Sequence, residues 1–206
     1  MLPSSEQITR KLDRLRGERG ISTYLKQHPQ LVFWTFFTIG GHSDYLISEF
    51  SLGKRLKADF VAMQSDSGGW HVTFVELEPV DDPLFNRDGT PTRRLRIAQS
   101  QILDWQHYSH YDGPSLRAQL AEAAQRDDIL GNSSPEFEPS SYSGIHLRDP
   151  MSYVQWEYWI VIGRRKALTD EKRQLRSALS HNSRYSVRSY DMFADTAKRA
   201  EEYRTN

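Results

Sequence analysis

Two glutamates in a run that predicts a buried strand are the first candidates for chemistry. The run FVELEP places Glu76 and Glu78 among apolar neighbours. Side chains two positions apart on a strand point to the same side, so both carboxylates are expected on one face, with Val75 and Leu77 on the other. Like charges side by side lower the stability of a sheet. The pattern therefore indicates that something on this face offsets the two charges.

The strand before this one adds two more charged side chains. KADFVAMQ and WHVTFVELEP are two β-type runs joined by a turn at Asp66–Gly69, which predicts an antiparallel hairpin. In the register that this turn favours, Asp59 lies opposite Glu76, and Lys57 lies opposite Glu78. A slip of one residue would break this alignment, because it moves every side chain of a strand to the other face.

Three carboxylates and a lysine on one face suit a hard divalent cation. Oxygen ligands of this kind bind Mg²⁺ or Mn²⁺, ions that keep bound water and accept phosphate oxygens. Such an ion lowers the pKa of a bound water and stabilises the charge on a transferring phosphoryl group. The alternative is a sheet with one wet face, on which the glutamates are solvated and Lys57 forms a cross-strand ion pair with Glu78.

The elements around the hairpin predict one mixed sheet with helices on its faces, an α/β or α+β fold. A capping box at Ser4 and Gln7 begins the first helix, and Ser22 caps the second, which ends near Pro29. The expected helices span residues 4–15, 22–29, 93–111, 115–125 and 170–182, with a polar helix from 194. The expected strands span 43–53, 57–64, 70–79, 152–163 and 184–193, and the aromatic run 31–41 is expected as a strand or a buried connection.

The composition narrows the class of protein. The 206 residues suffice for one full-size core, and the 27 basic and 27 acidic side chains cancel, so any nucleic-acid binding requires a local basic patch. The absence of cysteine excludes disulfides, cysteine-bound zinc and thiol nucleophiles. No apolar run approaches the ~20 residues of a membrane span, and no export signal begins the chain, so a cytoplasmic protein without a membrane partner is expected.

Two basic stretches are candidates for a nucleic-acid patch. Arg93, Arg94 and Arg96 stand at the start of a predicted helix and could hold phosphates near the acidic face. The run GRRKALTDEKRQLR, which begins with Arg164 and Arg165 after its glycine, is the densest basic stretch, and such clusters make salt-sensitive contacts with a nucleic-acid backbone. The alternative for both stretches is a charged surface that only faces water.

The hairpin and the helix after it resemble a known family. The segments LKADFVAMQ, WHVTFVELEP and DDPLFNRDGTPTRRLRIAQSQILDW are similar to the nuclease domain of Shedu anti-phage proteins. That domain in turn resembles the PD-(D/E)xK nucleases. The resemblance implies a restriction-endonuclease-like mixed central sheet flanked by helices, formed by residues 31–195 between an N-terminal helical segment, 1–30, and a polar C-terminal tail, 196–206.

The resemblance also implies an activity and a set of site residues. The family motif has an Asp on one strand, Glu-x-Lys on the next, and often a Gln on the following helix. Asp59 and Glu76 match the acids and would bind Mg²⁺, or Mn²⁺, with the Leu77 carbonyl as a further ligand, while Gln101 would orient the site or contact the scissile strand. The implied protein is a metal-dependent nuclease of antiviral defence that acts on nucleic acid, with DNA as the expected form, and that could form a homo-oligomer.

One position departs from the family motif, because Glu78 stands where the motif has its lysine. That lysine positions the attacking water and stabilises the developing negative charge, and a glutamate cannot do the second task. Three interpretations stay open. Glu78 is a further metal ligand or a general base, Lys57 supplies the cation from the neighbouring strand, or the domain is inactive and binds nucleic acid or a partner protein.

Overall fold

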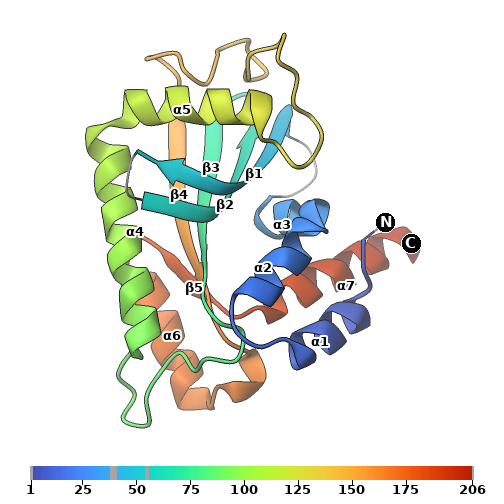
Figure 1. Cartoon of the computed structure of the whole chain (residues 1–206), viewed down its shortest axis with the longest axis vertical. Helices are drawn as coiled ribbons and strands as arrows, with labels where there is room; N and C mark the ends of the chain where they lie inside the picture. Colours follow the sequence, from blue (N-terminus) through green and yellow to red (C-terminus); the bar gives the residue numbers. More distant parts are fainter. Residues whose placement is uncertain (1, 38–40, 54–55, 206) are drawn as a thin grey trace. The chain divides into compact units, whose positions relative to one another are not determined.

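The chain folds around one β-sheet in the computed structural model, which describes residues 2–37, 41–53 and 56–205 (Figure 1). The described residues form seven α-helices: α1 (Ser5–Arg14), α2 (Arg19–Lys26), α3 (Pro29–Phe36), α4 (Arg93–Tyr111), α5 (Gly113–Arg126), α6 (Asp170–Asn182) and α7 (Asp191–Thr205). The five strands are β1 (Ser43–Leu52), β2 (Leu56–Ser65), β3 (Trp70–Leu77), β4 (Val154–Val161) and β5 (Ser186–Arg188), and a short 3₁₀ helix, η1, spans Arg165–Ala167.

These elements belong to two compact units, and the chain passes between them several times. The first unit comprises Met1–Thr35, Glu76–Ser100 and Trp159–Asn206, and the second comprises Phe36–Val75 and Gln101–Tyr158. The predicted division into a helical segment, 1–30, a central domain, 31–195, and a tail, 196–206, stays a prediction. In the first unit, α1 near the start of the chain packs against α7 at its end (Figure 1).

The sheet has the strand order β1-β2-β3-β4-β5 and is mixed, as predicted. β2 pairs antiparallel with both β1 and β3, whereas β4 and β5 are parallel. The Trp70 N–H donates to the Tyr153 carbonyl, and the Glu78 N–H donates to the Val161 carbonyl, both at 2.9 Å. The same offset in both hydrogen bonds shows that β3 and β4 run parallel.

The hairpin of β2 and β3 has the register that the sequence predicts. Its pairs run from Phe60 opposite Val75 to Ser65 opposite Trp70. The core of the second unit gathers around the β3 ring of Phe74, whose centroid lies 5.7 to 6.4 Å from those of Phe50, Trp105, Trp156 and Tyr158. A slip of one residue would turn Phe74 away from these rings, so the core fixes the register.

The aromatic run at 31–41 differs from the prediction of a strand. Its first part belongs to the helix α3, and residues 38–40 lie outside the described residues. Pro29 opens this helix because proline is tolerated in the first helical turn, where its missing N–H has no partner to lose. The alternative prediction of a buried segment is confirmed for residues 31–33.

The starts of the first two helices give one confirmed cap and one wrong prediction. The Ser4 side chain accepts from the Gln7 N–H (3.1 Å), and the Gln7 side chain accepts from the Ser4 N–H (2.8 Å), which completes the predicted capping box. The predicted cap at Ser22 is wrong, because α2 already begins at Arg19. The Ser22 N–H donates to the Glu18 carbonyl (3.0 Å), a bond within the first turn of that helix.

Gly69 is the hairpin residue whose place only a glycine fits. Its φ of 143° lies in a region that residues with a Cβ rarely adopt. An added Cβ would lie 2.6 Å from the backbone oxygen of Tyr153, the same oxygen that accepts from the Trp70 N–H. The Tyr153 carbonyl therefore limits the space at the hairpin turn and also accepts a hydrogen bond that pairs β3 with β4.

Gly69→Ala is expected to lower the free energy of unfolding by about 1–3 kcal/mol or more, because the variant combines a strained backbone with a steric clash. Chemical denaturation followed by circular dichroism measures the change. Gly113→Ala is the matched control, since an added Cβ at the start of α5 meets nothing within 4 Å, and it should leave the stability unchanged or slightly higher. Equal denaturation midpoints for the two variants would contradict this role of Gly69.

Candidate functional site

Three of the predicted site residues lie in the second unit. Lys57 and Asp59 belong to β2, and Gln101 lies on α4, where its side-chain amide donates to the backbone carbonyl of Lys57 at 2.8 Å. Lys57 is exposed, whereas Asp59 is half-buried between the fully buried Ala58 and Phe60. The structure thus ties the predicted glutamine to the predicted strand, two residues before the aspartate.

The ammonium group of Lys57 is held by Glu49, a β1 residue that was not identified from the sequence. The distance from Nζ to Oε2 is 2.7 Å, and the side chains are 55% and 50% exposed. The β1–β2 register, in which Phe50 lies opposite Ala58, sets Glu49 opposite Asp59. Glu49 also has a φ of 57°, a value that is uncommon for non-glycine residues. The pairing of the two strands is the signal that could have revealed this residue.

The other two predicted acids, Glu76 and Glu78, lie in the first unit and differ in their surroundings. Glu76 is half-buried near the end of β3, whereas Glu78 follows the strand and is only 4% exposed. The Glu78 N–H donates to the Val161 carbonyl, and the Glu78 carbonyl accepts from the Tyr190 hydroxyl at 2.7 Å. The backbone of Glu78 is therefore anchored on both sides, and Tyr190 is a supporting residue that the sequence pattern did not indicate.

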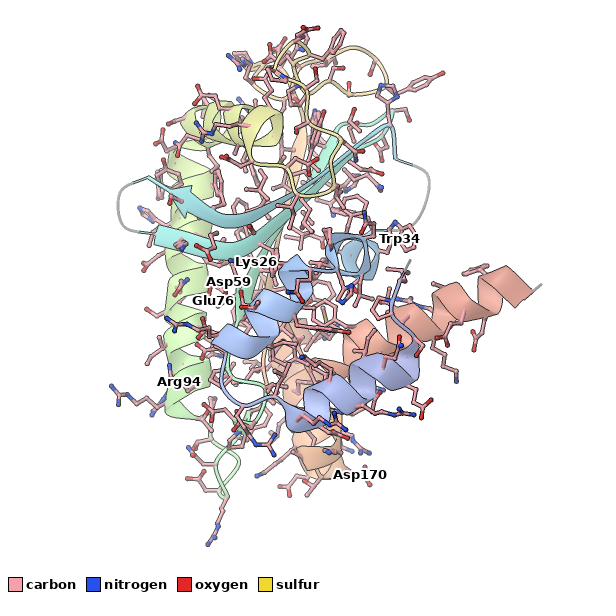
Figure 2. All side chains as sticks on the ribbon, turned by 45° about the vertical axis from the view of Figure 1, so that its right-hand side comes forward. Lys26, Trp34, Asp59, Glu76, Arg94 and Asp170 are labelled. Carbon is pink, nitrogen blue, oxygen red and sulfur yellow. The ribbon has the colours of Figure 1, made fainter. Side chains whose placement is uncertain are left out.

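Asp59 and Glu76 directly flank the last observed pair of the hairpin. Phe60 lies opposite Val75, Asp59 precedes Phe60 in the chain, and Glu76 follows Val75. Figure 2 labels the two acids, one on β2 and one on β3. The predicted alignment of the two carboxylates thus rests on the register that the neighbouring residues have. A register shifted by one residue, which would have separated them, is ruled out for this hairpin.

A lysine far from the motif in the sequence, Lys26, also belongs to the first unit. It ends α2, and both views show this helix beside the last residues of β3, where Glu76 lies (Figures 1 and 2). Ile21 and Leu25, on the inner face of α2, are fully buried and fix the helix to the core. No local spacing could have indicated Lys26, because only the packing of α2 determines what it faces.

The three arginines predicted at the start of a helix are found on the first turn of α4. Arg93, Arg94 and Arg96 are all exposed. Arg94 has one weak ion pair, with 3.8 Å between its Nε and Oδ2 of Asp82, and both side chains of this pair face water. These guanidinium groups therefore remain accessible to a phosphate.

Arg164, which the sequence predicted to bind phosphate, lies between two carboxylates of the protein. It is only 8% exposed and bridges Asp13 of α1 (2.6 Å) and Asp191 of α7 (3.1 Å). Hydrogen bonds from Lys166 and Arg164 hold the pKa of Asp13 below its usual value, so this carboxylate stays ionised near neutral pH. A nearly buried guanidinium with two acidic partners links helices rather than offering itself to a nucleic acid.

Arg165, the second arginine predicted in this stretch, is also engaged. Its side chain pairs with Asp195, and its backbone N–H donates to Oδ2 of Asp191 at 2.6 Å. Burial raises the pKa of Asp191, but the Arg165 N–H and the Arg164 guanidinium outweigh that effect and bring it below its usual value. The start of the basic stretch is thus largely neutralised by α1 and α7.

Two kinds of site are missing from the part of the chain that the structure describes. It contains no group of three or more His, Cys, Asp and Glu side chains arranged to hold a metal ion. None of its helices combines the length and the apolar character that a bilayer span requires.

One family match spans the hairpin, the helix that carries Gln101, and the strands around them. Residues 16–194 match the model of a family described as Shedu protein SduA, C-terminal, which confirms the resemblance seen in the sequence. No curated protein is similar enough in sequence to match the chain. The chain belongs to the family formed by the C-terminal region of the Shedu protein SduA.

Proposed function

We propose that this protein is a metal-dependent nuclease of antiphage defence, with DNA as its expected substrate. Membership in the Shedu family indicates the role in defence. The observation that supports a nuclease is the β2–β3 register, whose last observed pair is Phe60 opposite Val75, so that Asp59 and Glu76 are the next residues of the two strands. Two carboxylates at these places on adjacent strands match the acidic pair of the family motif.

The donor atoms of this pair fit Mg²⁺, with Mn²⁺ as the alternative. Asp59 and Glu76 would hold the ion through carboxylate oxygens, and the Leu77 carbonyl would be a further ligand. Mg²⁺ commonly binds one or two carboxylates and keeps several waters, so a ready-made cluster of three acids is not needed. When bound, the ion lowers the pKa of a water ligand and neutralises charge on the phosphate. Both acids are half-buried, so neither residue is enclosed completely in the core.

Gln101 is a positioning residue in this proposal. Its amide holds the Lys57 carbonyl at 2.8 Å and so ties α4 to β2 two residues before Asp59. A carboxylate that binds a metal must be fixed in direction, and a hydrogen bond to its own strand contributes to that.

The missing motif lysine leaves a need for a positive charge beside the attacked phosphate. Glu78 cannot supply it and would act as a metal ligand or a general base. Lys57 is already paired with Glu49 and exposed to water. We assign the role to Lys26, because α2 lies beside the end of β3 that carries Glu76 (Figure 2).

The second candidate is a non-catalytic module of the same fold that binds nucleic acid or a partner protein. The replacement of the motif lysine by Glu78 favours it. The two candidates differ in one respect that is simple to measure, because binding by the module would persist in EDTA and would produce no cleavage.

Glu76→Gln is expected to reduce Mg²⁺-dependent cleavage of plasmid and linear DNA at least about 100-fold, since it removes an anionic metal ligand at nearly constant shape. Cleavage rates measured against Mg²⁺ concentration, with an EDTA blank, test this. Glu122→Gln, at an exposed position on α5, is the control and should retain the wild-type rate. Cleavage that persists in EDTA or in Glu76→Gln would contradict the proposed metal site, and binding without cleavage would favour the module.

Gln101→Met should lower the cleavage rate about 10- to 100-fold and raise the Mg²⁺ concentration needed for half-maximal rate, because it releases the strand that carries Asp59. Gln125→Met is the matched control, since Gln125 of α5 also donates to a backbone carbonyl, that of Phe137, at 3.3 Å. Equal Mg²⁺ dependence of the two variants would show that Gln101 has no positioning role.

Lys26→Met is expected to reduce the turnover rate about 100-fold, the usual effect of removing one group that stabilises transition-state charge. Lys57→Met should have a much smaller effect, because its charge is shared with Glu49. Single-turnover cleavage at saturating Mg²⁺ compares the two, and Lys26→Arg should recover part of the rate. A larger loss of rate in Lys57→Met than in Lys26→Met would show that Lys57 supplies the positive charge.

A further inference from the structure

The basic residues of the first unit fall into two sets. Arg164 and Arg165 have carboxylate partners, as described above. Arg176 of α6, Arg188 of β5 and Arg199 of α7 form no ion pair with any carboxylate among the described residues, and the hydrogen bonds of Arg188 and Arg199 go to neutral oxygens. The second set therefore keeps its positive charge.

Arg188 and Arg199 line one groove of about 500 Å³ at the edge of the sheet. β5 is the edge strand and lies between α6 and α7 (Figure 1). Besides the two arginines, its lining includes Trp159, Asp195, Lys198 and Glu202. Its two acids already have basic partners, because Asp195 pairs with Arg165 and Glu202 with Lys198. The lining is thus positive at its two arginines.

Each of these arginines is held in place but retains free donors. The Arg188 guanidinium lies over the Trp159 ring, 5.2 Å from its centroid, and donates to the Val187 carbonyl at 3.1 Å. Arg199 donates to the Thr196 hydroxyl at 3.0 Å. Since a guanidinium has five N–H groups, both side chains are positioned with most of their donors open to a ligand.

Arg176 adds positive potential near Arg188. Its Nε is buried and has no hydrogen-bond partner. Burial lowers the pKa of Arg176, and the nearby charges of Arg188, Arg165 and Arg173 lower it further, against a weaker opposing effect of Asp191. Like charges held this close destabilise the free protein, and a bound anion would offset that repulsion.

We propose that this groove binds the phosphate groups of a nucleic-acid strand through Arg188 and Arg199. Guanidinium groups bind phosphate oxygens in a planar, bidentate manner, and the Trp159 ring holds the Arg188 guanidinium in place for such a contact. The proposal adds a binding site to the nucleic-acid partner of the proposed function, but it uses neither Asp59 nor Glu76 and requires no cleavage.

Fluorescence anisotropy with a short labelled single-stranded oligonucleotide, in EDTA and over a range of NaCl concentrations, tests the site without any cleavage. The double variant Arg188→Gln/Arg199→Gln is expected to bind at least 10-fold more weakly. The slope of log affinity against log salt should fall by about 1.4, because two phosphate contacts are lost. The control Arg126→Gln/Arg148→Gln removes two arginines of the second unit that have carboxylate partners, and should leave affinity and slope unchanged.

A third variant separates binding from folding. Arg176→Met should raise the thermal midpoint or leave it unchanged, because it relieves repulsion, and should weaken binding all the same. Unchanged affinity in both the double variant and Arg176→Met, or an equal loss in the control, would overturn the proposal. Competition by inorganic phosphate and by a mononucleotide shows whether the groove prefers a free phosphate, a single nucleotide or a strand. Saturation by a mononucleotide without any binding of the oligonucleotide would overturn a strand as the occupant.

Discussion

The register between β2 and β3 is the constraint on which the candidate site depends. The turn at Asp66–Gly69 sets it locally, and the rings around Phe74 fix it through the core. Because side chains alternate along a strand, this one register decides which acids share a face. In this register, Asp59 and Glu76 are the residues next to the last observed pair. The proposed metal site therefore depends on the pairing of β2 with β3.

Charge in this molecule is arranged in two ways. Arg164 is nearly buried, bridges two carboxylates and connects helices, so it contributes to the fold of the first unit. Arg188 belongs to the same unit, but it donates hydrogen bonds to neutral oxygens and lies over an aromatic ring, and it forms no ion pair with a carboxylate among the described residues. Paired charges of the first kind stabilise a structure, whereas charges of the second kind are kept where a ligand will complete them. The further site rests on this difference.

The sequence predicted the hairpin, its register and the mixed sheet, because turn residues and strand alternation are local signals. The aromatic run that became α3 could not be assigned, since a short apolar run suits a buried helix as well as a strand. The partner of Lys57 depends on the pairing of β1 with β2, whereas the position of Lys26 and the burial of Arg164 depend on elements distant in the sequence. The sequence does not distinguish Arg164 from Arg188. Their different roles follow only from the residues that lie near each of them in the folded chain.

The central claim is that Asp59 and Glu76 hold one divalent ion. Anomalous scattering from crystals grown or soaked with Mn²⁺ tests it most directly, because the ion itself is then located. We expect one strong peak in contact with a carboxylate oxygen of each residue, and no such peak in Glu76→Gln. A peak bound elsewhere, or none at these two acids at a saturating Mn²⁺ concentration, would contradict the account.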